Sequence, residues 1–278
     1  MSPIPALPAV VFDFDGTVCV GDEPVRAYAD AVLAAASVSP ERAAEVRGRL
    51  DAFLAGPSTG IGTGARTGTN TGTPDGPSYI DGYAAVAALT AELASPAEQD
   101  AAYHTARRAL AEGRLAIAAP LGLAELLHSL AGRAERVLVT NAPALGIAEA
   151  LTAIGLEGCF DRLITDARKP DGWSRILPQL TSEADRPAAR LLSIGDIWLN
   201  DLAEPLTVGA TAFLIDRFGG TRGPAHAAAP VIEELYPALQ AWVDAPEAFR
   251  TAHPAAMPAA LAASAAAPTP AGAPARAD

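Results

Sequence analysis

Short apolar runs alternate with helical segments along most of this chain, and this alternation constrains the fold more than any other feature. The runs have the length of buried strands and lie at residues 8–14, 136–141, 161–166, 190–196 and 210–216. Helical patterns follow at residues 144–155 and 172–180, each about as long as a crossover between parallel strands requires. Strands that alternate with helices form parallel sheets, so we predict an α/β fold.

Residues 21–118 interrupt this alternation. The segment is rich in alanine, shows helical periodicity at residues 41–56 and 98–113, and contains few strand signals. We therefore predict a helical insert between the first strand and the rest of the sheet. Within it, residues 56–78 form a Gly/Thr-rich tract. No strand precedes this tract and no GK[ST] signature occurs in it, so we interpret it as a surface loop and not as a nucleotide site.

The end of the chain has a different composition. Residues 251–278 are rich in alanine and proline and have no periodic apolar face, so we predict that they are disordered. The predicted organisation is then a sheet domain at residues 1–20 and 119–250, a helical domain at residues 21–118, and the tail.

Charge and residue usage exclude several classes of function. The formal net charge of -12 repels nucleic-acid phosphates, and no basic stripe offsets it. No apolar run is long enough to span a bilayer, and the first residues lack the basic lead-in of a secretory signal. The two cysteines and four histidines show neither a disulfide framework nor a zinc-binding pattern. We therefore expect a cytoplasmic protein whose partners include neither nucleic acid nor membrane.

Polar side chains follow the predicted strands at the points where the strands end. They are Asp13 and Asp15 after the first strand, Thr140 and Asn141 after the second, Lys169 after the third, and Asp196 and Asp201 after the fourth. Because the carboxyl ends of parallel strands meet at one edge of a sheet, we expect these side chains to converge. Each residue alone also fits a milder interpretation as part of a turn, a helix start or a solvated cation. Lys169, however, is the only lysine of the chain.

Four segments, DFDGT at residues 13–17, VTN at 139–141, RKP at 168–170 and GDIWLND at 195–201, carry these side chains. In this order they resemble the four motifs of the haloacid dehalogenase-like (HAD) hydrolase superfamily. The resemblance covers roughly residues 8–245. It implies a Rossmann-like, doubly wound parallel sheet of strand order 5-4-1-2-3, with an inserted helical C1 cap domain. Asp13 and Asp196 are then expected at the topological switch point, where open α/β sheets bind ligands.

The resemblance also implies the chemistry of the carboxylates. Asp13 is the expected nucleophile, which attacks phosphorus and forms an aspartyl-phosphate. Asp15 is the expected general acid, which protonates the leaving oxygen and then takes a proton from the attacking water. Mg²⁺ is the expected cofactor, because it prefers oxygen ligands, and it is held by Asp13, Asp196 and the backbone carbonyl of Asp15.

Phosphate binding is assigned by the same resemblance to the remaining motif residues. Thr140 and Asn141 are expected to donate hydrogen bonds to the phosphoryl oxygens, and Lys169 to neutralise charge on the nucleophile and the transferred group. Asp201 is expected to orient the lysine or the water shell of the metal.

Within the superfamily, the sequence favours a Mg²⁺-dependent phosphatase that hydrolyses a small phosphorylated metabolite and is similar to phosphoglycolate phosphatases. Dehalogenases of the superfamily lack the second aspartate that Asp15 supplies. Phosphonate-cleaving relatives use a cap lysine, which is absent here, and transport ATPases carry threonine in place of Asp15 and have membrane helices. The alternatives are a phosphomutase of the same architecture and a catalytically silent binding or scaffold protein.

Three further residues are notable. Trp198 places a large aromatic side chain in the metal loop, where small or polar residues are more usual. The arginines at positions 107 and 108 could contact a second anionic group of the substrate, but we prefer their interpretation as a solvated helix face.

Overall fold

A single parallel sheet organises the molecule. The computed structural model describes residues 6–56, 79–182, 184–218 and 223–258. In this part of the chain the strand order is β3-β2-β1-β4-β5-β6, and every neighbouring pair is parallel. The strands are β1 (Ala9–Phe12), β2 (Glu135–Val139), β3 (Arg162–Ile164), β4 (Leu191–Gly195), β5 (Thr211–Ile215) and β6 (Ala227–Ala229). The predicted α/β class is confirmed, and so is the predicted order of the first five strands.

Among the described strands, β6 is the one that the sequence did not predict. It pairs with β5 at the edge of the sheet through the stretch Ala227–Ala229. Alanine has low strand propensity, and three alanines lack the β-branched side chains that mark the other strands. The pairing therefore depends on backbone hydrogen bonds and on the neighbouring strand, neither of which a local pattern reveals.

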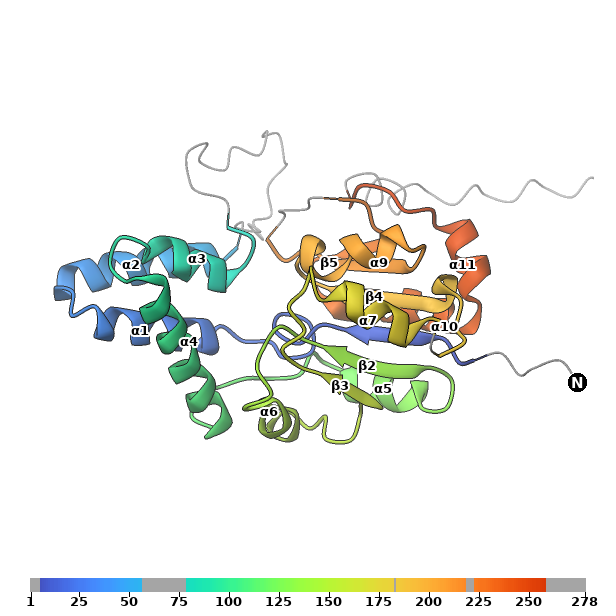
Figure 1. The fold of residues 1–278 in the computed structure, drawn as a ribbon, viewed down its shortest axis with the longest axis horizontal. Coiled ribbons are helices and arrows are strands. Elements are labelled where there is room, and N and C mark those ends of the chain that lie inside the picture. Colours follow the sequence, from blue (N-terminus) through green and yellow to red (C-terminus); the bar gives the residue numbers. More distant parts are fainter. Residues whose placement is uncertain (1–5, 57–78, 183, 219–222, 259–278) are drawn as a thin grey trace, which may run out of the picture.

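Helices cover both faces of the sheet, as a doubly wound fold requires (Figure 1). Alternate strand residues point to opposite faces, so Val10 and Phe12 belong to one apolar cluster while Ala9 and Val11 belong to another. The first face packs against α5 (Leu123–Leu130), α6 (Ile147–Ala153), α10 (Tyr236–Asp244) and α11 (Pro246–Ala252). The second packs against α7 (Trp173–Leu180), α8 (Trp198–Asp201) and α9 (Ala203–Thr207). Two short 3₁₀ turns, η1 (Ala188–Arg190) and η2 (Ile232–Leu235), complete this layer structure.

Four helices form a second group beside the carboxyl end of the sheet (Figure 1). They are α1 (Glu23–Ala35), α2 (Pro40–Leu54), α3 (Gly82–Leu89) and α4 (Pro96–Ala111), and they share an apolar cluster of their own. Ser39 and Ser95 cap α2 and α4, each followed by a proline in the first turn. The helices predicted at residues 41–56 and 98–113 are confirmed as α2 and α4. Most of the Gly/Thr-rich tract, residues 57–78, lies outside the described residues.

The two connections between the helical group and the sheet lie side by side. Val20 and Ala118 form an antiparallel bridge with backbone hydrogen bonds of 2.8 and 2.9 Å. The chain therefore enters and leaves the helical group at adjacent positions. Among the described helices, none combines the length and the apolar character needed to cross a membrane.

The prediction of a disordered tail is wrong for its first residues. Helix α11 extends to Ala252, and Ala256 exchanges backbone hydrogen bonds of 2.9 and 2.8 Å with Ala225. Backbone donors and acceptors pair without regard to side-chain hydropathy, so the lack of an apolar period did not exclude this contact. The rest of the tail, residues 259–278, lies outside the described residues.

Candidate active site

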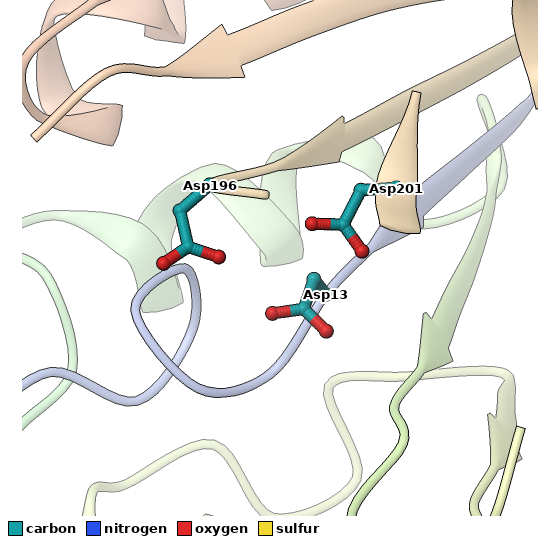
Figure 2. A group of neighbouring side chains, drawn as sticks. All are labelled: Asp13, Asp196 and Asp201. Atoms are coloured by element: carbon teal, nitrogen blue, oxygen red, sulfur yellow. The ribbon is translucent and has the colours of Figure 1, made fainter. Parts of the chain in front are cut away.

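Three carboxylates from separate segments converge at the carboxyl end of the sheet (Figure 2). Asp13 follows β1, Asp196 follows β4, and Asp201 closes α8. One oxygen of each lies within 4.8 Å of the others. Strands β1 and β4 are neighbours in the sheet, and the chain reverses its winding between them, which brings their ends together at the switch point.

Lys169 neutralises part of this charge. Its Nζ donates hydrogen bonds to Asp13 Oδ1 at 2.7 Å, to Asp201 Oδ1 at 2.6 Å and to the Val139 carbonyl at 2.8 Å. All three donors of the ammonium group are therefore used. Burial lowers the pKa of Lys169, but the carboxylates of Asp13 and Asp201 raise it by more, so the side chain stays charged. The milder interpretation of Lys169 as a solvated cation is wrong, since only 2 % of its side chain is exposed.

Asn141 holds the backbone of Lys169 in place. Its amide nitrogen donates to the Lys169 carbonyl at 3.0 Å, and its amide oxygen accepts from the Lys169 backbone N–H at 2.5 Å. The sequence predicted a phosphate contact for Asn141 but not this positioning contact. Thr140 is buried, lines the cavity described below, and accepts a hydrogen bond from the Ala142 N–H at 3.0 Å. The phosphate-binding roles of Thr140 and Asn141 stay predictions.

Asp201 is fixed from both sides. Its Oδ1 accepts from Lys169, and its Oδ2 accepts from the backbone N–H of Ile197 at 3.0 Å. Gly195 makes room for this carboxylate, because a Cβ at that position would lie 2.3 Å from Asp201 Oδ2. Burial raises the pKa of Asp201, while Lys169 opposes this shift. The sequence predicted that Asp201 orients either the lysine or the water shell of the metal. In the structure Asp201 contacts the lysine.

Asp196 is the carboxylate with an unmet requirement for a partner. Gly16 adopts a left-handed conformation with φ of +83°, and a Cβ there would lie 2.4 Å from Asp196 Oδ2. The other oxygen, Oδ1, is buried and has no hydrogen-bond partner among the described residues. Burial raises the pKa of Asp196 well above its usual range, and Asp13 and Asp201 raise it further. A carboxylate oxygen that is buried without a partner, beside two other carboxylates, fits a bound divalent cation.

Asp15 lines the same cavity and also contacts the helical group. Arg107 Nη1 on α4 lies 3.6 Å from Asp15 Oδ1, and the Tyr83 hydroxyl on α3 lies 3.5 Å from the same oxygen. Burial raises the pKa of Asp15 to about 6, against the opposing charge of Arg107. Residues of α3 and α4 therefore meet the segment after β1 at this side chain.

The interpretation of positions 107 and 108 as a solvated face is wrong for one of them. Arg108 is exposed and donates to Thr105 Oγ1 at 3.2 Å, as expected. Arg107 is 1 % exposed, and sequence reasoning missed its position beside Asp15. A signal for it exists, because Arg107 lies three residues before the buried Leu110 and four residues after Tyr103, which lines the cavity, so the three share one face of α4.

A cavity of about 350 Å³ lies between the sheet and the helical group. Its floor contains Asp13, Asp15, Lys169, Asp196 and Asp201, and its opposite wall comes from α1, α2, α3 and α4. The volume falls within the roughly 300–1,000 Å³ typical of small-molecule sites. The predicted site residues therefore line one cavity.

Trp198 does not line this cavity. Its indole N–H donates to the Pro224 carbonyl at 2.9 Å, and its ring packs against the small apolar cluster that contains Leu202 and Leu214. Trp198, the unusual aromatic residue that follows β4, thus contributes to the packing of the second face of the sheet.

Comparison with known proteins supports the fold. No family model and no curated protein matches the chain. A magnesium-bound HAD-hydrolase, YfnB, from Bacillus subtilis is 17% identical, covers 84% of this chain and 99% of its own, and has a TM-score of 0.54. The L-2-haloacid dehalogenase RSc1362 is 19% identical over 84% and 99%, with a TM-score of 0.50. A Thermotoga maritima protein described as a beta-phosphoglucomutase is 16% identical over 84% and 99%, also with a TM-score of 0.50. The chain therefore has the haloacid dehalogenase-like hydrolase fold, with its four motif segments at the carboxyl edge of the sheet.

Proposed function

We propose that this protein is a Mg²⁺-dependent phosphatase that hydrolyses a small phosphorylated metabolite through an aspartyl-phosphate on Asp13. The observation that carries this proposal is the contact of the Lys169 ammonium group with the Asp13 carboxylate at 2.7 Å, inside an acidic cluster that faces the cavity. The buried ammonium group holds this carboxylate in a fixed position, as an attacking nucleophile requires.

The metal ligands in this proposal are Asp13, Asp196 and the backbone carbonyl of Asp15. Asp196 fits the role because its Oδ1 has no other partner among the described residues. Asp201 is the poorer ligand, since both its oxygens already accept hydrogen bonds. When bound, Mg²⁺ supplies positive charge for the phosphoryl oxygens and reduces the repulsion between an anionic substrate and the carboxylates.

The proposed reaction has two steps, and Asp13 takes part in both. Asp13 attacks phosphorus, the bond to the ester oxygen breaks, and Asp15 gives its proton to the departing alcohol. In the second step Asp15 takes a proton from water, the water oxygen attacks phosphorus, and inorganic phosphate leaves while the Asp13 carboxylate is restored. A pKa of about 6 suits Asp15 for both directions of proton transfer near neutral pH. Lys169 stabilises the added negative charge of the transition state.

Phosphate release is the measurement that tests this proposal. We expect the purified protein to release phosphate from p-nitrophenyl phosphate with Mg²⁺, and to lose that activity with EDTA or with Asp13→Asn. Chloride release from 2-chloropropionate, which a dehalogenase would catalyse, should be absent. A phosphomutase would instead return the phosphoryl group to a second hydroxyl of a sugar phosphate. Full activity in chelator, or no phosphate release from any of a panel of phosphomonoesters, would contradict the proposal.

A further inference from the structure

The wall of the cavity opposite the catalytic carboxylates differs in character from its floor. The helical group contributes Val25, Leu54, Tyr83 and Tyr103 to this wall, and the segment after β5 contributes Phe218. These side chains are aliphatic or aromatic. With Asp13 placed to attack phosphorus, the alcohol portion of the ester must extend from the floor toward this wall.

We propose that this wall binds the alcohol portion of the substrate and selects an uncharged aromatic or apolar group. The inference rests on the proposed phosphatase function and names the class of phosphomonoester that the same site takes. It differs from the expectation of a phosphoglycolate-like substrate, whose alcohol portion carries a carboxylate.

The aromatic part of the wall is held in place by further rings. Tyr83 and Tyr103 pack edge to face with centroids 5.8 Å apart, and Tyr28 contacts both, at 6.2 and 5.9 Å. Phe218 stacks on Phe53 at 4.6 Å with an interplanar angle of 27°. Rings fixed in this way offer apolar contact area without the entropy cost of ordering flexible side chains on binding.

The charges around the cavity disfavour a second anionic group. Among the described residues that line it, the cations are Lys169 and Arg217. Lys169 is engaged by Asp13 and Asp201. Arg217 lies 2.9 Å from Asp22 and also donates to the Leu54 carbonyl at 3.1 Å, so its charge is balanced within the wall.

Two other residues strengthen this charge argument. Arg107 lies behind Asp15 with 1 % exposure, so it does not present its guanidinium group to the cavity. Asp81, the N-cap of α3, adds another carboxylate to the lining. A carboxylate or second phosphate on the alcohol portion would lose water and face acidic groups, while both cations that line the described part of the cavity are already paired with carboxylates. An apolar group meets no such cost.

Matched pairs of substrates test the inference on the unmodified protein. Benzyl phosphate and 4-carboxybenzyl phosphate differ only in a carboxylate on the far side of the ring from the phosphate. Hexyl phosphate and 2-(2-hydroxyethoxy)ethyl phosphate have chains of equal length that differ in polarity. We expect kcat/KM with Mg²⁺ to be at least tenfold higher for the first member of each pair. Calorimetric binding of benzylphosphonate and 4-carboxybenzylphosphonate, neither of which is hydrolysed, should show the same order of affinity.

Substitution of a residue of the cavity wall provides a second test of the inference. Tyr103→Lys places a cation in the wall, and we expect it to lower the benzyl to 4-carboxybenzyl ratio of kcat/KM at least tenfold. His104→Lys is the matched control, because His104 is the next residue of α4, is exposed and does not line the cavity. This control should keep the ratio of the unmodified protein.

The outcomes separate this inference from the proposed function. Hydrolysis of both members of each pair with equal efficiency, or preference for the 4-carboxybenzyl ester, would overturn the inference while leaving the phosphatase in place. Absence of hydrolysis of every ester would instead refute the proposed function. If Tyr103→Lys does not fold, the substrate pairs on the unmodified protein still decide the question.

Discussion

Arg107 Nη1 lies 3.6 Å from Asp15 Oδ1, although the two residues belong to α4 and to the segment after β1. The guanidinium group is buried, and none of its nitrogens has a hydrogen-bond partner among the described residues. A buried cation that makes no hydrogen bond costs stability. Arg107 therefore contacts the group that we propose as the general acid.

Arg107→Met should lower both stability and activity. Methionine keeps much of the apolar bulk but leaves the Asp15 carboxylate without its cationic partner, so we expect the melting temperature to fall, with a loss on the order of 1–3 kcal/mol in unfolding free energy. Because Asp15 loses its charged neighbour, kcat/KM should fall roughly tenfold. Arg108→Met, an exposed neighbour, should change stability by less than about 0.5 kcal/mol. A lower melting temperature with unchanged kinetics would identify Arg107 as purely structural.

Lys169→Arg preserves charge but not geometry. The ammonium group has three acceptors within 2.8 Å and a side chain that is 2 % exposed, so a planar guanidinium group does not fit without moving them. We expect kcat/KM to fall on the order of 100-fold, and overpacking to cost about 1–3 kcal/mol of stability. Steady-state kinetics and urea unfolding measure both effects, with Arg108→Lys as the exposed control. Activity within threefold of the parent would remove Lys169 from the catalytic site.

His226 should make the fold sensitive to acid. Its Nδ1 accepts from the backbone N–H of Ala212 at 3.1 Å, and burial, assisted by the charges of Arg250 and His253, lowers its pKa from 6.5 to about 4. The unfolded chain therefore takes up a proton first as the pH falls, so this stabilising contribution is complete above about pH 6.5 and is lost toward pH 4.

The comparison variant for this prediction is His226→Asn, which keeps an acceptor at the same place but does not titrate. Between pH 7 and pH 4.5 the unfolding free energy of the parent should fall by on the order of 1–3 kcal/mol more than that of the variant. Urea denaturation at both pH values measures this difference. Equal losses in the two proteins would show that His226 is not the responsible group.

Two truncations test where the ordered chain ends. Removal of residues 259–278 should leave the melting temperature unchanged, because residues 251–258 supply the pairing with Ala225. Removal of residues 251–278 also deletes that pair and the stacking of His253 on Phe249 at 4.2 Å. We expect it to lower the melting temperature by roughly 2–8 °C, from about 1–2 kcal/mol of lost contacts. Equal melting temperatures for the two truncated proteins would show that the contact contributes nothing.

Strands β1 to β5 and the candidate site beside them could be predicted because their signals are local. Each of these strands is an apolar run, and the motif residues come after four of them along the chain, so the topology brings Asp13, Lys169 and Asp196 to one edge of the sheet. The contacts made by Arg107 and Asn141 could not be predicted in the same way. Arg107 depends on how α4 packs over the sheet, and Asn141 on the path of the loop before Pro170, both of which are set by tertiary packing.

Strand β6 and the Ala225–Ala256 pair illustrate a second limit. Both are built by backbone hydrogen bonds between alanine-rich segments, whose side chains carry neither a strand nor a turn signal. The aromatic wall of the cavity was missed for a related reason, since Tyr83 and Tyr103 come from separate helices and their rings meet only in the folded protein.

Detection of a phosphorylated Asp13 tests the proposed chemistry most directly. The purified protein with Mg²⁺ would be mixed with ³²P-labelled benzyl phosphate, quenched in acid within milliseconds, digested and mapped by mass spectrometry. We predict a label that is stable in acid, is released by hydroxylamine as acyl phosphates are, resides on the peptide containing Asp13, and is absent from Asp13→Asn. Turnover without any such label, or a label on another residue, would contradict nucleophilic catalysis by Asp13.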